Sequence, residues 1–376
     1  MISFTYQYKL KPSKKQVQYL EMYLDICREV YNWNHRERKD WIQSRKSSVD
    51  RCSIEKEYII PVSQPFPNYN IQSGNLTQAK KKYPHLNKVH SQVLQSTLKR
   101  LALAWDNFFK VKEQGFPKFK NKNRFRSFLY PQIKNTDLRE SEIRLPKIGW
   151  IRIRKSRPYP QRFQPKQLRI VRKATGYFAQ IIFVSKKSVP DPLPGKKSLG
   201  LDAGISSFVA NSKGETIKTP LFVLKAARKL KLASDPAPPT GALGSASLLQ
   251  RRLKHKIKGS SNWLKLQRKI AKLHFKVTSQ REDWLFKLAH YFCDQTDNIF
   301  VEDIDFRSWQ KGLFGKQIGS SAIGKFINQI LPFVCWKRGI FYSYVDKDFT
   351  SQTCPNCGAV KKKTLQQRMH ECSQCG

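Results

Sequence analysis

Two pairs of cysteines near the C-terminal end constrain the fold of this chain more than any other feature. The pairs, separated by fourteen residues, are Cys354-Pro-Asn-Cys357 and Cys372-Ser-Gln-Cys375. Each CxxC pair can present two thiolates from one tight turn, and two such turns complete the four-cysteine set that structural zinc prefers. A redox pair or chance clustering is the alternative, and two matched pairs at this spacing disfavour it. The spacing predicts a zinc ribbon whose zinc has no open position for catalysis.

The other four cysteines are scattered along the chain and have the character of small buried hydrophobic residues. They are Cys27, Cys52, Cys293 and Cys335. Such cysteine usage indicates a reducing compartment. The first ten residues have no signal-peptide pattern, and the sequence holds no apolar stretch of about 18 residues, so neither secretion nor membrane insertion is expected.

The charge of the chain predicts a polyanionic partner. It has 71 Lys and Arg against 27 Asp and Glu, a net charge of +44 over 376 residues. Phosphate backbones neutralise such a surface and release counterions, which makes nucleic acid the leading partner. An anionic membrane or a basic tail would gather the charge in one helix or one terminal block, whereas here it is spread throughout. Hydrophobic residues at 39% and aromatics at 12% supply a core and exclude global disorder.

The first forty residues predict a strand followed by a helix. Apolar and polar residues alternate from Ile2 to Leu10, the period of a half-buried strand. Ser13 and Gln16 have the spacing of a capping box, and apolar residues then recur on one helical face from Val17 to Tyr31.

The pattern from residue 50 to residue 188 predicts helices inserted before a small antiparallel sheet or barrel. Residues 50–75 are polar and contain proline, which indicates a loop, and a helix is expected over 89–111. From Gly115 to Phe128 basic residues alternate with aromatics. That segment can lay cations on phosphates and rings on bases, or can bury its rings and leave its lysines in water. Strands are expected at 143–153, 168–171 and 177–184, in a sheet that includes the first strand.

Alternating strands and helices across 198–345 predict an α/β domain. The Pro-rich run 189–195 precedes it as a linker, and residues 234–247 have the composition of a loop. A long basic helix carries the apolar stripe Leu266, Ile270, Leu273 and Val277. The other expected elements are strands at 198–210, 299–304 and 340–345 and a helix at 323–336.

Two acidic residues lie in the apolar strands of this domain. Asp202 is in Gly-Leu-Asp-Ala-Gly, and Glu302 is in Phe-Val-Glu-Asp-Ile. Carboxylates on buried strands are costly unless a cation neutralises them, and two on neighbouring strands could hold Mg²⁺ for phosphodiester hydrolysis. Bonding to backbone amides or lysines explains the same residues, so spacing alone leaves both interpretations open. Asp303 and Asp305 are expected to face away from Glu302 or to lie in the next loop.

Several motifs, in order along nearly the whole chain, resemble one family, the transposon-encoded TnpB (OrfB) proteins, which are related to the type V CRISPR effectors. The markers are the Tyr6–Leu10 strand with Pro12 and Gln16, Arg28-Glu-Val-Tyr-Asn32, Gly115-Phe-Pro-Lys-Phe-Lys120, Arg144-Leu-Pro-Lys-Ile-Gly149, Gly200-Leu-Asp-Ala-Gly204, Lys258-Gly-Ser-Ser-Asn262, Val301-Glu-Asp303 and Thr350-Ser-Gln-Thr-Cys354.

The resemblance implies a multidomain α+β protein with four parts. These are a wedge-type β-barrel (1–12 and 125–188), a helical recognition insert (13–124), a RuvC-like, ribonuclease H-type nuclease domain (196–349) and the zinc ribbon (350–376). It also implies that Asp202 and Glu302 are catalytic ligands of Mg²⁺, while Cys354, Cys357, Cys372 and Cys375 hold structural zinc.

The activity implied by the resemblance is RNA-guided cleavage of DNA by a transposon-associated protein of the transposase class. A guide RNA from the transposon end would pair with target DNA, while the protein reads duplex shape and a short flanking motif. A prokaryotic cytoplasmic protein associated with the nucleoid, and not with a membrane, is expected.

One feature of the family is not found in the sequence. Relatives carry a third catalytic Asp after the last zinc knuckle, and no residue up to Gly376 can be assigned to that role. A missing carboxylate is expected to lower metal affinity and to weaken or abolish cleavage by this chain, while RNA and DNA binding survive. Three alternatives to the nuclease stay open at the level of sequence, and the absent Asp favours the first of them. They are a nuclease-deficient, RNA-guided DNA-binding repressor, a transposase that joins strands without RNA, and a zinc-ribbon RNA-binding protein without catalysis.

Overall fold

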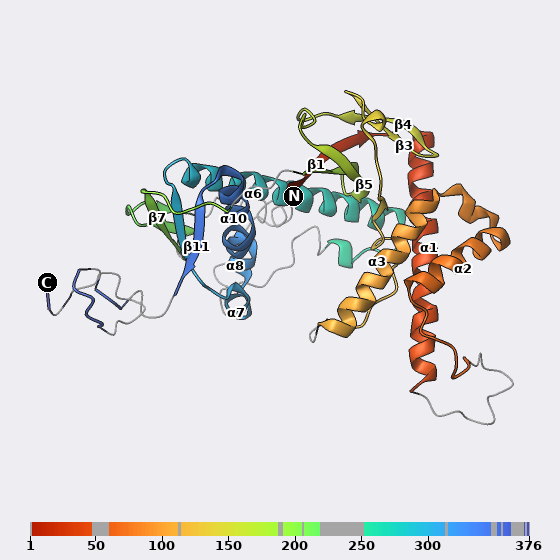
Figure 1. The fold of residues 1–376 in the computed structure, drawn as a ribbon, viewed down its shortest axis with the longest axis horizontal. Coiled ribbons are helices and arrows are strands. Elements are labelled where there is room, and N and C mark those ends of the chain that lie inside the picture. The colour runs from red at the N-terminus through yellow and green to blue at the C-terminus, as the bar shows by residue number, and fades with distance from the viewer. Residues whose placement is uncertain are drawn as a thin grey trace. The chain divides into compact units, whose positions relative to one another are not determined.

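A computed structural model of the chain divides into two compact units, residues 1–189 and 190–376, each described here by itself (Figure 1). The division falls at the Pro-rich run predicted as a linker. The structure describes residues 2–46, 60–111, 114–186, 191–204, 207–218, 252–312, 315–346, 352–354, 356–361, 372 and 374–375. The loop predicted at 234–247 and Cys52 lie outside the described residues.

The first unit contains a six-stranded antiparallel half-barrel sheet with the strand order β2-β5-β6-β1-β4-β3. Its strands are β1 (Ile2–Lys11), β2 (Ser127–Tyr130), β3 (Glu142–Leu145), β4 (Gly149–Arg154), β5 (Gln164–Lys173) and β6 (Gly176–Ser185). The opening strand lies inside the sheet, paired with β6 and β4, which confirms the predicted sheet. The sequence did not predict β2, because its four residues continue the basic and aromatic alternation that precedes it.

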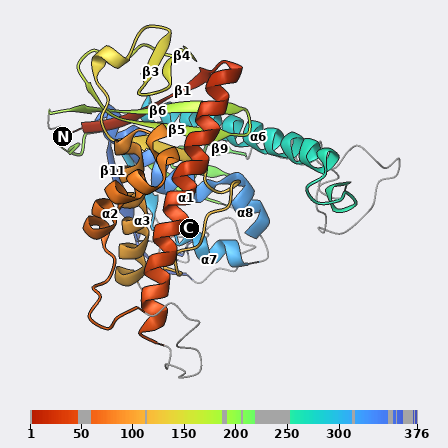
Figure 2. The same cartoon turned by 90° about the vertical axis from the view of Figure 1, so that its right-hand side faces the viewer.

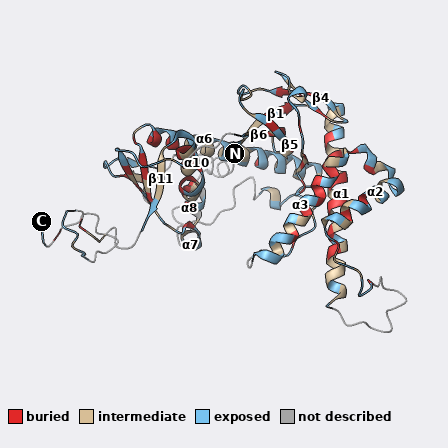
Figure 3. Cartoon of the chain, viewed as in Figure 1, coloured by how far each residue is buried: buried red, intermediate tan, exposed pale blue. Residues whose placement is uncertain are grey.

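Helices pack beside this sheet, and Figures 1 and 2 show α2 and α3 next to α1. They are α1 (Lys14–Ser44), α2 (Tyr69–Lys82), the short 3₁₀ helix η1 (Pro84–Lys88) and α3 (Ser91–Lys110). The capping box that starts α1 is confirmed: the Gln16 amide donates to Ser13 Oγ at 3.2 Å, and the Ser13 amide donates to Gln16 Oε1 at 3.0 Å. Figure 3 shows the buried residues concentrated along the facing sides of α1 and α3.

The prediction of a loop over residues 50–75 was wrong at its end, because α2 begins at Tyr69. Asn68 caps this helix by accepting a hydrogen bond from the Ile71 amide at 3.1 Å. Only Gln72 and Leu76 of the helix are buried. Two buried residues are too few to show a helical period in the sequence. The Asn, Ser and Gly content of α2 therefore made the segment resemble a loop.

The second unit contains a five-stranded mixed sheet with the strand order β11-β10-β7-β8-β9. Its strands are β7 (Ser198–Ala203), β8 (Val209–Asn211), β9 (Thr216–Ile217), β10 (Asn298–Glu302) and β11 (Phe341–Val345). β10 pairs in parallel with β7 and β11, whereas β7, β8 and β9 pair antiparallel. The single strand predicted at 198–210 is therefore two strands. The sequence predicted one continuous strand because the residues of β7 and β8 follow the same alternation of apolar and polar positions.

The helices of the second unit pack on one face of this sheet. They are α6 (Ser261–Cys293), α7 (Phe306–Lys311), α8 (Gly315–Ser321), α9 (Ile323–Lys325), the π-helical turn η3 (Phe326–Ile330) and α10 (Leu331–Arg338). Leu285 and Phe292 of α6 join Phe326 and Leu331 in the core. The helix predicted at 323–336 is confirmed, and it stops at Gly339, whose φ of 73° suits glycine. Among the described helices, none is long and apolar enough to cross a membrane.

Candidate metal centres and nucleic-acid interface

Asp202 and Glu302 lie side by side on neighbouring parallel strands. β7 and β10 pair with Leu201 opposite Val301, so the next position of each strand places the two acidic residues together. Leu201 and Val301 are buried in the core, and alternation therefore sends the two carboxylates to the opposite face of the sheet. Paired strands lie roughly 4.8 Å apart, which lets both side chains reach one cation.

The two carboxylates line a hollow of about 280 Å³ on this face, with walls from β7, β8, β10 and β11. Partial burial raises the pKa of the Asp202 carboxyl above that of an ordinary aspartate, although the residue as a whole is exposed. Among the described residues, no hydrogen bond or ion pair holds the Asp202 carboxylate. A desolvated carboxylate next to a second one fits a divalent cation, which prefers such oxygen ligands.

The burial of Asp202 gives a prediction about stability and pH. Because the pKa of the folded carboxyl is raised, ionising it costs the folded state more than the unfolded state. Asp202→Asn should therefore raise the unfolding temperature at pH 7 in the presence of a chelator. The gain should vanish below about pH 4, where the carboxyl is protonated in both states. Calorimetry at the two pH values measures this, and a lower unfolding temperature at pH 7 would contradict it.

The two acidic residues after Glu302 lie where the alternation predicted. β10 ends at Glu302, and the amide of Asp303 donates to the Val345 carbonyl at 3.1 Å. Asp305 is in the following loop, where Oδ1 accepts a hydrogen bond from the Arg307 amide at 3.0 Å and caps α7. This role leaves Asp305 outside the carboxylate pair.

The four cysteines of the predicted zinc ribbon converge. Their sulfur atoms, from Cys354, Cys357, Cys372 and Cys375, all lie within 4.8 Å of one another. The Sγ atoms of Cys354 and Cys375 are 3.6 Å apart, and those of Cys357 and Cys372 are 3.5 Å apart. Zinc–sulfur distances of about 2.3 Å in a tetrahedron place sulfurs at nearly this separation. The set therefore fits zinc and leaves no position for substrate.

Backbone amides tune these thiols for metal binding. The Gln374 amide donates to Cys372 Sγ at 3.4 Å, and such donors lower the pKa of the Cys372 thiol to about 6. The first cysteine turn closes with a hydrogen bond of 3.0 Å from the Gly358 amide to the Cys354 carbonyl, and Gly358 has a φ of 74°. Thiolates are the form that zinc binds, so the turn geometry favours the loaded state.

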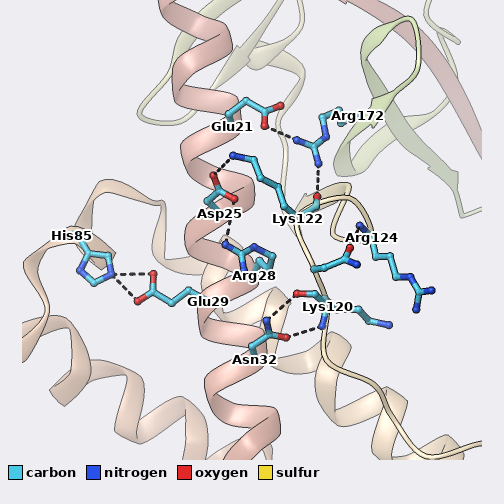
Figure 4. Close-up of polar contacts among 11 residues, drawn as sticks. Glu21, Asp25, Arg28, Glu29, Asn32, His85, Lys120, Lys122, Arg124 and Arg172 are labelled. Atoms are coloured by element: carbon cyan, nitrogen blue, oxygen red, sulfur yellow. Dashed lines mark hydrogen bonds and ion pairs between the residues drawn. The ribbon is translucent and has the colours of Figure 1, made fainter. Parts of the chain in front are cut away.

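A third candidate site is the basic segment, residues 114–126, which is fixed to α1 (Figure 4). Asn32 holds the backbone of Lys120 from both sides, donating to its carbonyl at 2.9 Å and accepting from its amide at 2.8 Å. Lys122 pairs with Asp25 at 3.2 Å. The segment thus joins two of the motifs that were recognised separately in the sequence.

The two interpretations of the basic segment each hold for one half of it. Phe125 is buried in the core, as the packing interpretation requires. Phe116 and Phe119 are exposed by 39% and 45%, beside exposed cations such as Lys118. The first half therefore offers rings and cations together, the arrangement that binds bases and phosphates.

Glu21 anchors the sheet to α1 beside this segment, which gives a prediction about stability. It accepts from Arg172 at 2.5 Å and from the Tyr177 hydroxyl, and the carboxylate and the guanidinium are half-buried. Glu21→Ala removes the acceptor of the Tyr177 hydroxyl and the ion-pair partner of Arg172, which keeps its hydrogen bond to the Lys122 carbonyl, and should lower the free energy of unfolding by about 2 kcal/mol. Denaturant titration measures this change. Asp40→Ala, which breaks the exposed Arg36–Asp40 pair on the same helix, should change it by less than about 0.5 kcal/mol.

Comparisons with known proteins place the chain among transposase-like and Cas12f1-like sequences. A family described as probable transposase matches residues 181–311, and the Cas12f1-like TNB domain matches residues 325–376. A helix-turn-helix domain family matches residues 1–47, although the described residues there form one strand and one helix. The chain is 28% identical over 383 residues to the putative RNA-guided DNA endonuclease InsQ of Escherichia coli strain K12, covering 98% of this chain and 86% of that protein. The chain is therefore similar to the TnpB (OrfB) family in three segments of its sequence.

Other similarities extend this resemblance to the family. A putative RNA-guided DNA endonuclease of Streptomyces pristinaespiralis is 28% identical over 301 residues, which are 79% of this chain and 70% of that protein. The TnpB-like protein L79 of Acanthamoeba polyphaga mimivirus is 26% identical over 119 residues, covering 30% of this chain and 22% of that protein. A cryo-EM structure of a Cas12f1–sgRNA–target DNA complex shares the fold, with a TM-score of 0.52, 12% identity and coverage of 96% of this chain and 81% of that one.

Two residues of these sites were not identified as functional from the sequence motifs alone. Asn32 was noted as part of a motif, but nothing in the sequence showed that it binds the backbone of Lys120, 88 positions away. Ser212 follows β8 and lines the hollow of the carboxylate pair, with its hydroxyl accepting from the Gly200 amide at 3.2 Å. In the sequence, only the predicted turn at Asn211–Gly214 indicated where Ser212 lies.

Proposed function

We propose that this chain is an RNA-guided DNA endonuclease of the TnpB (OrfB) family whose nuclease centre is built on Asp202 and Glu302. The observation that carries the proposal is their placement together, on one face of two parallel strands and inside one hollow. The names of the relatives from Escherichia coli and Streptomyces pristinaespiralis support this activity. In the proposal, residues 196–349 form a RuvC-like nuclease domain, 1–12 and 125–188 the wedge, 13–124 the recognition insert and 350–376 the zinc ribbon.

The chemistry follows from the two carboxylates. Mg²⁺ bound there would activate water and stabilise the leaving oxygen of a phosphodiester. Asp202 and Glu302 would supply the oxygen ligands that hold and orient the ion, and the open hollow above them would admit the strand to be cut. Zinc at the four cysteines would have a structural role, because four thiolates would complete its coordination.

The partners are a guide RNA from the transposon end and a DNA target that pairs with it. The net charge of +44 supports the binding of two polyanions together. The basic segment and the exposed lysines of α6, including Lys265, Lys269 and Lys272, are surfaces suited to phosphate backbones. Such a protein would work in the prokaryotic cytoplasm, at the nucleoid.

Purification of the full-length protein with its bound nucleic acid tests the proposal. We expect the copurifying RNA to map to a transposon end, and an altered guide sequence to redirect cleavage of a plasmid to the matching site in the presence of Mg²⁺. Occupancy of the matching site without any cut would favour the repressor alternative. Cutting or joining of transposon ends by RNA-free protein would refute the guided mechanism.

A further inference from the structure

A cavity of about 200 Å³ lies in the first unit, between α1, α2 and η1, away from the basic segment and the cysteine turns. Its walls are largely apolar, with Val30 of α1, Leu76 and Ala79 of α2, and Leu86 of η1 among them. No step of the proposed cleavage chemistry uses it. A preformed concave site with an apolar floor and few polar groups is the usual form of a small-ligand pocket.

A buried hydrogen-bond network fixes one carboxylate at the wall of this cavity. Gln72 Nε2 donates to Glu37 Oε2 at 2.7 Å and to the Asn34 carbonyl at 2.9 Å. Gln72 Oε1 in turn accepts from Arg38 Nε at 3.0 Å, and both Gln72 and Arg38 are buried. Glu37 is thus held in one orientation by side chains that cannot move freely.

A second carboxylate, Glu29, also lines the cavity from α1. The ring Nε2 of His85 lies 3.2 Å from Glu29 Oε1 and 3.3 Å from Oε2, and Figure 4 shows the ring facing this carboxylate. Each carboxylate can accept more hydrogen bonds than these contacts use, because its two oxygens offer about four acceptor positions. The cavity therefore presents a fixed acceptor, Glu37, and a second, more exposed acceptor, Glu29, to whatever enters it.

Two exposed aromatic rings complete the lining. Trp33 is 69% exposed and Tyr83 is 42% exposed, and both line the cavity. Large exposed rings beside a cavity commonly mark a binding site. Lys82 lies next to one of these rings, with Nζ 5.7 Å from the centre of the Tyr83 ring.

We propose that this cavity receives one unpaired nucleobase that carries an exocyclic amino group. The two carboxylates exclude a phosphate or an acidic side chain from the cavity, while Lys82 beside the Tyr83 ring attracts anions. A nucleotide meets both conditions, because its ring is uncharged and its backbone is anionic. Trp33 and Tyr83 supply stacking surfaces, and a glutamate accepts from an exocyclic amine such as N4 of cytosine.

The inference uses the proposed function only to take nucleic acid as the partner, and its test needs no cleavage. The probes are hexamers of uridine and the same hexamers with one central cytidine, bound to full-length protein freed of nucleic acid. Uracil has no exocyclic amine, so we expect the cytidine hexamer to bind about tenfold more tightly, the contribution of one well-placed base. Competition against a labelled hexamer measures the ratio.

Variants assign the preference to this cavity. Glu37→Gln keeps the shape of the side chain and should reduce the cytidine preference to nearly one. Trp33→Ala should weaken the cytidine hexamer by about tenfold, through the loss of a stacked ring. Tyr19→Ala, which removes another exposed ring of α1, should leave both affinities unchanged.

The same pair of sequences made as deoxyribonucleotide hexamers identifies the source of the base. A cytidine preference that is larger for RNA assigns the site to the guide, and one larger for DNA assigns it to the target. Equal binding of the uridine and cytidine hexamers in both chemistries would overturn the proposal. A preference that persists unchanged in both Glu37→Gln and Trp33→Ala would overturn it as well. Loss of cleavage in any variant does not enter the test.

Discussion

Replacement of Asp202 by alanine is expected to reduce the rate of guided DNA cleavage by about a thousandfold or more. The substitution removes one of the two carboxylates that lie together on β7 and β10. A bound metal contributes several kcal/mol to stabilising charge in the transition state, and each 1.4 kcal/mol or so changes the rate tenfold. Single-turnover cleavage of a guide-matched plasmid at saturating protein measures the loss.

The same variant should keep its RNA and its affinity for matched DNA, because Asp202 lies outside the basic segment and outside the lysines of α6 that are proposed to bind phosphates. It should also bind Mn²⁺ more weakly than the parent protein, which titration can follow without any cleavage. Asp303→Ala is the matched control, since Asp303 follows β10 and is exposed outside the pair. If Asp202→Ala cleaved DNA at the parental rate, Asp202 and Glu302 would not form the nuclease centre, whatever the rate of Asp303→Ala.

Local sequence signals were sufficient for the elements whose burial repeats with a regular period. The strand at Ile2 and the helix after Ser13 were predicted because alternation and capping act over a few residues. α2 was missed because it buries only two of its residues, so its stability comes from contacts with other helices. The division of residues 198–210 into two strands was missed because both halves share one alternation.

The candidate sites were predictable to the extent that their residues are neighbours in sequence. The geometry of each cysteine pair could be predicted from its spacing, because two residues between two ligands define a turn. Asp202 and Glu302 lie a hundred positions apart, and their meeting depends on the parallel pairing of β7 with β10, which no local signal contains. The cavity of Trp33 and Glu37 could not be foreseen, because its lining comes from three elements and the first half of one of these, α2, was predicted to be a loop.

The second large effect is expected at the cysteine turns, where Cys372→Ser should abolish stoichiometric zinc binding. The sulfur atoms lie within 4.8 Å of one another, and the substitution replaces the thiol with the most lowered pKa by a hydroxyl that stays protonated. Structural zinc in small domains contributes about 10–16 kcal/mol of apparent binding free energy, so the segment should lose its fold together with its metal. Metal analysis of the purified protein should fall from one zinc per chain to nearly none.

The loss should remain local to the ribbon. Residues 1–189 form a compact unit with its own core, so its thermal transition should be the same in Cys372→Ser as in the parent protein. Amide hydrogen exchange should accelerate around Thr353 and Val360, whose β-bridge depends on the first cysteine turn. Lys361→Ala, a change of charge beside the same bridge, should retain full zinc. Parental zinc content in Cys372→Ser would mean that the four sulfurs do not form a metal site, and that their convergence has another cause.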